Sequence, residues 1–117
     1  MASHKLGSTV PAQIRSQDGY LIFNGGRGSL AILDGEWREI KHELVTHASP
    51  IVDLQMTSSV AFTGASDGLI RSWDLQSGQK LQETPTRYSI VRAIAPGQGV
   101  VASLSTSATH TAIEVSG

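Results

Sequence analysis

The chain has 117 residues, enough for one domain at most, and contains no cysteine. Nine Lys and Arg face ten Asp and Glu, so the basic excess of proteins that bind phosphate backbones is missing. Without cysteine there are no disulfides or thiolate sites, and no apolar run approaches the roughly 18 residues that span a bilayer. We expect an intracellular protein, cytoplasmic or nuclear, with no membrane segment and with nucleic acid disfavoured as a partner.

Strand-forming segments fill most of the chain. Charged residues make up 16 % of the sequence, against about 25 % in an ordinary soluble domain, and Gly, Ser and Thr take their place. Short segments rich in Val, Ile and Thr alternate with turn sequences such as Asp18-Gly19, Asp67-Gly68 and Ser77-Gly78. No window keeps the apolar spacing of three and four that a helix requires. The sequence predicts an all-β fold.

In chain order, residues 1–10 are either a flexible leader or a closing strand, and three repeats of strands follow. The repeat period is 39 to 40 residues, since Phe23 and Phe62 lie 39 apart, and Val101 follows Ala61 by 40. The first repeat, 11–46, and the second, 47–85, each contain four expected strands, whereas the third, 86–117, contains three. The expected strands are 12–16, 20–24, 29–33, 37–44, then 51–56, 60–65, 69–75, 79–83, then 89–95, 100–104 and 109–115.

The second repeat carries a set of four polar side chains at a distinctive spacing. Asp67 follows Thr63 by four positions, Trp73 follows Asp67 by six, and His47 precedes them all. The imidazole of His47 can bond both the Asp67 carboxylate and the Thr63 hydroxyl, which in turn reaches the indole N–H of Trp73. Four buried polar groups would then satisfy one another, where each left unpaired costs about 1–3 kcal/mol.

This set resembles the structural tetrad of the WD-repeat (WD40) β-propeller family, whose repeat ends in a Trp-Asp pair like Trp73-Asp74. One departure is that Thr46-His47 stands where the family has Gly-His. The resemblance implies a partial β-propeller of two to three four-stranded antiparallel blades. Residues 47–85 form a well-matched blade, 11–46 a degenerate blade and 86–117 an incomplete degenerate one.

The flanking repeats depart from the tetrad. We expect Asn24 to stand in the place of Thr63 and Leu33 in the place of Trp73 in the first repeat. In the third repeat the expected replacements are Ser103 and Ile113.

A closed propeller ring needs about four to eight blades, which is more than this chain supplies. We expect the ring to be completed by copies of the chain, by another protein chain or by further sequence. The unfinished third repeat would otherwise expose an apolar face, for which the expected residues are Ile90, Ile94, Val101 and Leu104.

The resemblance implies a non-catalytic scaffold for protein–protein interaction, or a subunit of a multiprotein complex. By analogy with the family, partner-binding residues near the tetrad turn would be Arg27, Ser49, Pro50, Ser66 and Thr106. The alternative is a propeller associated with RNA or a ribonucleoprotein. There is no Gly-x-Ser-x-Gly elbow, the four histidines lack metal-ligand spacing, and the glycine-rich stretch 24–28 lacks the lysine of a phosphate-binding loop. We expect no catalytic residues, no metal and no cofactor.

Overall fold

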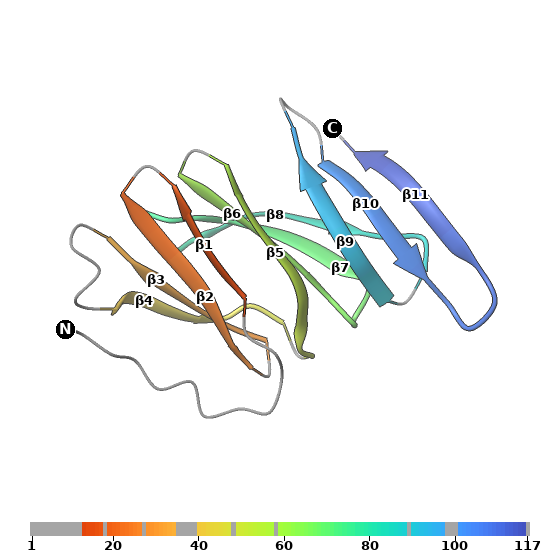
Figure 1. Ribbon diagram of the computed structural model, residues 1–117, viewed down its shortest axis with the longest axis horizontal. Helices are drawn as coiled ribbons and strands as arrows, with labels where there is room; N and C mark the ends of the chain where they lie inside the picture. Colours follow the sequence, from red (N-terminus) through yellow and green to blue (C-terminus); the bar gives the residue numbers. More distant parts are fainter. Residues whose placement is uncertain are drawn as a thin grey trace.

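The computed structural model describes residues 13–17, 19–26, 28–34, 40–47, 49–57, 59–88, 90–97 and 101–116. These form eleven strands in three antiparallel sheets (Figure 1). Sheet 1 comprises β1 (Ile14–Gln17), β2 (Tyr20–Gly26), β3 (Ser29–Leu33) and β4 (Ile40–Val45). Sheet 2 comprises β5 (Ile51–Thr57), β6 (Val60–Ala65), β7 (Leu69–Asp74) and β8 (Lys80–Pro85), and sheet 3 comprises β9 (Ile90–Pro96), β10 (Val101–Thr106) and β11 (Thr111–Ser116).

The all-β prediction is confirmed, and each of the eleven expected strands has a counterpart in the structure. β3 and β6 match the expected bounds, and most other strands differ by one or two residues at an end. The largest difference is at β4, which begins at Ile40, whereas the strand was expected from residue 37. The expected leader, 1–10, lies outside the described residues. In the part of the chain that the structure describes, there is also no helix with the length and apolarity needed to cross a membrane.

Strand pairing repeats with a period of 40 residues from sheet 1 to sheet 2. Ile14 pairs with Phe23 in sheet 1, and Leu54 pairs with Thr63 in sheet 2. The third and fourth strands of the two sheets follow the same shift, including an irregularity after Ile32 that recurs after Ser72. The two sheets are therefore the same unit built twice.

This register corrects one expected correspondence in the first repeat. Phe23, and not Asn24, occupies the position of Thr63, because the match between the two phenylalanines is one residue short of the structural period. A shift of one residue places every side chain of a strand on the opposite face, so Asn24 corresponds to Gly64. Leu33 does stand in the position of Trp73, since it pairs with Leu21 as Trp73 pairs with Ala61.

Sheet 3 follows the period in its first two strands only. Ile94 pairs with Ser103 as Leu54 pairs with Thr63, so Ser103 holds the position expected for it. The β10–β11 hairpin is three residues longer than its counterpart, because Ser103 pairs with Glu114 while Thr63 pairs with Arg71. Ile113 therefore corresponds to Ile70, and its expected correspondence with Trp73 is wrong.

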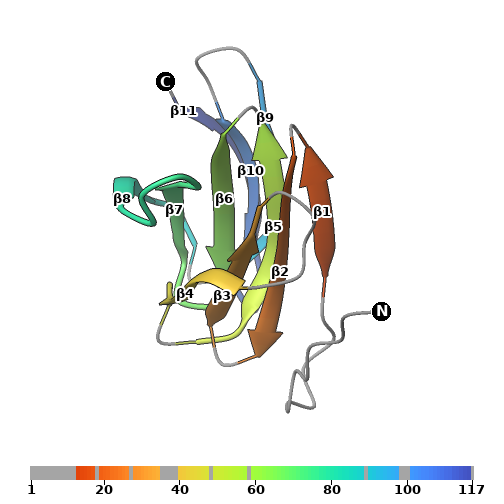
Figure 2. The same ribbon diagram turned by 90° about the vertical axis from the view of Figure 1, so that its left-hand side faces the viewer.

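The sheets pack face to face, in the order 1, 2, 3 from left to right in Figure 1, and one behind another in Figure 2. β5 lies against β1 and β2 on one side of sheet 2, and β9 lies against β5, β6 and β7 on the other. The core between sheets 1 and 2 consists of Ile22, Leu30, Ile32, Ile51, Leu54, Ala61, Trp73 and Leu75. A smaller core between sheets 2 and 3 consists of Ile70, Val91 and Ile94, with Phe62 packed against it.

The expected exposed face of the third repeat needs correction. Ile94 is only 4 % exposed, because it faces sheet 2. Leu104 belongs to the outer face, together with Ile113, which is 78 % exposed. The side chains of Ile90 and Val101 lie outside the described part of the structure.

One end of the stack contains the hairpins β2–β3, β6–β7 and β10–β11, along the lower margin of Figure 1. Each inter-sheet linker is fastened to one of these hairpins by a threonine. The backbone N–H and the hydroxyl of Thr46 both donate to the carbonyl oxygen of Gly28, at 2.8 and 2.6 Å. Thr86 makes the same pair of bonds to Gly68, at 2.9 and 2.8 Å. These threonines hold the end where the candidate site lies.

Candidate functional site

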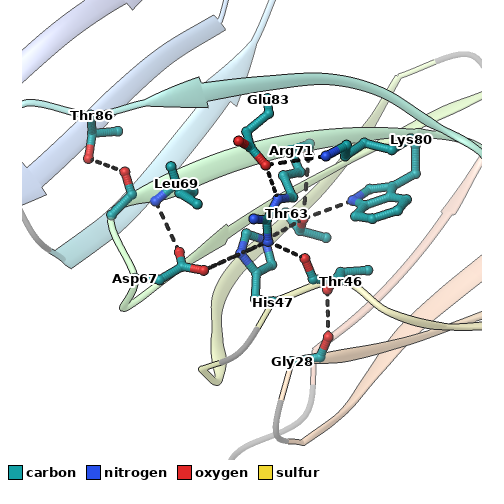
Figure 3. A network of polar contacts seen from close by, with 12 residues as sticks. Gly28, Thr46, His47, Thr63, Asp67, Leu69, Arg71, Lys80, Glu83 and Thr86 are labelled. Atoms are coloured by element: carbon teal, nitrogen blue, oxygen red, sulfur yellow. Dashed lines mark hydrogen bonds and ion pairs between the residues drawn. The ribbon is translucent and has the colours of Figure 1, made fainter.

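Four side chains from separate elements meet in a polar network between sheets 1 and 2 (Figure 3). His47 comes from the β4–β5 linker, Thr63 from β6, Asp67 from the β6–β7 turn and Trp73 from β7. Nδ1 of His47 lies 3.0 Å from Oδ2 of Asp67, and its Nε2 lies 2.7 Å from the hydroxyl oxygen of Thr63. The indole N–H of Trp73 donates to that same hydroxyl oxygen over 3.0 Å. The structure thus brings together all four residues that the sequence placed in one set.

The hydrogen bonds are complete when His47 is neutral and carries its proton on Nδ1. The ring then donates to Asp67 through Nδ1 and accepts the Thr63 hydroxyl proton at Nε2. Burial lowers the pKa of His47 below its usual 6.5, although the hydrogen bond and the charge of Asp67 oppose this shift. The nearby positive charge of Arg71, whose Nη1 lies 3.3 Å from Nδ1, also lowers the pKa.

Asp67 links the network to its own turn as well. Its Oδ1 accepts the backbone N–H of Leu69 over 3.0 Å, while Oδ2 accepts from His47. Gly68 adopts φ +78, which an L side chain rarely tolerates, and this is why glycine follows Asp67 in so tight a turn. The carboxylate therefore fastens the β6–β7 turn to the β4–β5 linker.

Arg71 extends the network outward and was missed by the sequence analysis. Its Nη1 donates to the backbone carbonyl of Thr46, and its Nε donates to Oε1 of Glu83 over 2.7 Å. Lys80 lies 3.3 Å from the same oxygen, and the hydrogen bonds from Arg71 and Lys80 hold the pKa of Glu83 below its usual value. The available signal was alternation along β7, since a residue two positions before Trp73 lies on the same sheet face.

The geometry gives the network a structural role. The Thr63 side chain is fully buried, and its hydroxyl already accepts from Trp73 and donates to His47. A nucleophile must reach its substrate, whereas this oxygen is enclosed and both of its bonds are committed. Across the described ranges of the chain, no group of three or more His, Cys, Asp or Glu side chains is arranged to hold a metal ion.

The expected partner-binding residues lie around this network. Ser49 and Pro50 follow His47 in the linker, and Ser66 precedes Asp67 in the turn, so the bond between His47 and Asp67 brings the two segments together. Pro50 is exposed, and Ser49 and Ser66 are half-buried. Thr106 ends β10 and lies in the corresponding hairpin of sheet 3. Arg27 lies outside the described residues.

Sheet 3 has a different side-chain cluster at the corresponding place, and the sequence analysis did not find it. The rings of Tyr88 and His110 stack with their centroids 5.9 Å apart, and the guanidinium of Arg87 lies 5.8 Å from the centre of the Tyr88 ring. Glu114 accepts the backbone N–H of Arg87 over 2.6 Å. This cluster joins the β8–β9 linker to the β10–β11 hairpin, as His47 and Asp67 join the preceding linker and hairpin. Its residues meet because that hairpin is three residues longer.

No protein-family model matches the chain, and no curated protein is similar to it by sequence. Solved structures of computationally designed proteins are similar in fold. The designed Ika8 protein superimposes with a TM-score of 0.70 at 24 % identity, covering 77 % of this chain and 28 % of its own. The designed Ika4 protein gives a TM-score of 0.75 at 24 % identity, covering 87 % of this chain and 62 % of its own. The chain thus spans less than two thirds of either design, and the likeness shows the fold alone.

Proposed function

We propose that this chain is a segment of a WD-repeat β-propeller and acts as a non-catalytic scaffold for protein–protein interaction, as a subunit of a larger complex. In this interpretation each of the three sheets is a blade, and sheet 2 is the blade with a full tetrad. The observation that carries the proposal is the closed network of His47, Thr63, Asp67 and Trp73, at the family's spacing.

The network suits a binding scaffold because it fixes the shape of one end of the stack. Asp67 and His47 join a turn to a linker, and Thr46 joins the same linker to the preceding hairpin. Loops held in one conformation lose little entropy when a partner binds, so they bind more tightly than loops that must first be ordered. The proposed contact surface comprises Ser49, Pro50, Ser66 and Thr106, with Arg27 from the first repeat.

Mapping of a protein interaction tests the proposal. Proteins captured by the chain would be identified, purified and titrated directly against a variant carrying Pro50→Asp and Ser66→Glu. The matched control is Gln79→Glu, because Gln79 is exposed in the β7–β8 connection at the opposite end of sheet 2. We expect the double variant to bind at least about tenfold more weakly, a loss of about 1.4 kcal/mol, and the control to bind as the wild type does.

The salt dependence of binding separates a protein partner from RNA. A protein partner that docks on Pro50 and Ser66 should stay bound in high salt, whereas RNA retention through phosphate contacts should fall steeply. Titration of a labelled single-stranded RNA of mixed sequence measures the second case. Tight, salt-sensitive RNA binding without any protein bound at this end would overturn the proposed function, as would a catalytic activity that requires Asp67.

A further inference from the structure

Sheet 2 is covered on both faces, whereas sheets 1 and 3 each present an outer face against which no other described sheet packs. The outer face of sheet 3 is apolar and slightly hollowed. Ile113 is 78 % exposed and Val115 is 68 % exposed, and both lie on β11. On the outer face of sheet 1, Ile14 of β1 is 59 % exposed. The residues that make up the outer face of sheet 3 are Ala93, Ala95, Ala102, Leu104, Ile113 and Val115.

The register shows what the same positions do inside the chain. Leu30 of sheet 1 and Leu54 of sheet 2 belong to one core cluster, and both are fully buried. One repeat later, Ile70 of sheet 2 and Ile94 of sheet 3 again share a cluster, at 5 % and 4 % exposure. These pairs are equivalent by strand pairing, so the two interfaces use the same contact twice.

The next pair in this series cannot form within the described chain. The counterpart of Ile70 on sheet 3 is Ile113, and the counterpart of Leu54 on sheet 1 is Ile14. Both are isoleucines, and both are largely exposed. Each outer face therefore displays one half of the contact that joins neighbouring sheets.

We propose that two copies of this chain associate head to tail, with the outer face of sheet 3 of one copy against the outer face of sheet 1 of the next. Ile113 of one copy then packs near Ile14 of the other, as Leu30 packs in the cluster of Leu54. The proposal identifies one partner for the scaffold proposed above. It rests on the strand register and on burial, and not on the His47 network.

The polar contacts at the interfaces agree with this pairing. Between sheets 2 and 3, the Asp53 carboxylate accepts the backbone N–H of Ile94 over 2.8 Å. Ala93 stands at the equivalent position of sheet 3, so covering that face buries no carboxylate. The junction between copies keeps the apolar contact but lacks this hydrogen bond, so we expect it to be weaker than the junctions within the chain.

Head-to-tail contact uses two different surfaces, and this makes it testable by mixing. Such a contact generates rings when the rotation closes and filaments when it does not, whereas a contact between identical faces stops at a dimer. Ile113→Asp blocks only the face of sheet 3, and Ile14→Asp blocks only the face of sheet 1. Each variant therefore keeps one intact surface that the other variant can bind.

Light scattering at rising protein concentration measures the mass. For the wild type we expect a mass that rises above the 12.4 kDa of one chain. Each variant alone should stay at 12.4 kDa, and an equimolar mixture should reach twice that mass and stop. The control is Leu81→Asp, which removes an apolar side chain 56 % exposed on β8 of the middle sheet and should assemble as the wild type does.

A wild type that remains a single chain at every concentration overturns the proposal. Two folded variants that do not combine also overturn it, and a dimer retained by Ile14→Asp alone would indicate contact between two sheet 3 faces instead. Circular dichroism verifies the fold, and Ile113→Thr with Ile14→Thr replaces the pair if aspartate unfolds the sheet. The result is distinct from that of the partner titration, because Pro50→Asp and Ser66→Glu change neither outer face.

Discussion

At the scale of single residues, the Thr63 hydroxyl is the atom on which the network depends. It accepts from Trp73 and donates to His47, and it lies in a fully buried position. Without this hydroxyl, two buried partners have no bond, and an unsatisfied buried group costs about 1–3 kcal/mol. The methyl group of Thr63 contributes packing alone, at about 0.8 kcal/mol for one buried carbon.

Two substitutions at Thr63 separate these contributions. Thr63→Val keeps the shape and removes the hydroxyl, so we expect it to lower the free energy of unfolding by about 1–3 kcal/mol. Thr63→Ser keeps the hydroxyl and removes the methyl group, and should cost about 1 kcal/mol. Urea unfolding followed by circular dichroism measures both. A valine variant as stable as the serine variant would mean that packing, and not the hydrogen bonds, holds this position.

The neutral state of His47 makes the stability of the fold depend on pH. Because burial lowers the pKa of His47 in the folded chain, the unfolded chain takes up a proton first as the pH falls below about 6.5. The contribution of His47 is complete above that pH and is lost progressively below it. We expect the free energy of unfolding to decrease from pH 7 towards pH 5.

The control for this pH dependence is His47→Gln, which cannot titrate. The variant should be less stable at pH 7 but should lose less stability between pH 7 and pH 5. Glu83 does not interfere, because its lowered pKa places its contribution above about pH 4.5, with the loss at still lower pH. Equal slopes in the wild type and in His47→Gln would contradict the assignment of a neutral buried imidazole.

At the scale of elements, the hairpin turns determine how each linker meets its sheet. Gly28 has φ +78, and a Cβ atom there would lie 2.1 Å from the carbonyl oxygen of His47. Gly19 has a similar φ of +83, but a Cβ atom there would meet nothing within 4 Å. The two glycines share the conformational constraint, and only Gly28 adds a close approach to backbone.

This difference predicts unequal effects of alanine. Gly19→Ala should cost about 1–2 kcal/mol, the penalty for a left-handed conformation. Gly28→Ala should cost about 1–3 kcal/mol more, because the linker at His47 must move. Thermal and urea unfolding of the two variants measure the difference. Equal losses would show that the linker moves aside at no cost.

Most of the strands could be predicted because alternation and turn sequences act locally. β3 and β6 begin and end where the sequence placed them, between turns that contain glycine. The register was harder to predict. Matching Phe23 to Phe62 gave 39 residues, while the hydrogen bonds give 40, and nothing local distinguishes the two. A longer β10–β11 hairpin likewise moved Ile113 to the other face of its sheet.

At the scale of the whole molecule, stability comes from faces that cover one another. Trp73 and Leu54 are buried because sheet 1 covers them, and Ile70 is buried because sheet 3 covers it. The equivalent positions on the two outer faces, Ile14 and Ile113, remain exposed. Units of this kind gain stability from each added neighbour, which is the physical basis for the proposed association of copies.

The sequence by itself determined the all-β class, the number of strands and the four residues of the network. These depend on side-chain alternation, glycine turns and the need of buried polar groups for partners. Only the tertiary structure decided the 40-residue register, the place of Arg71 beside Thr46 and the pairing of Tyr88 with His110. It also decided that Ile94 faces inward while Ile113 faces outward. The physical reason is that burial depends on which sheet lies opposite, and that partner lies about 40 residues away along the chain.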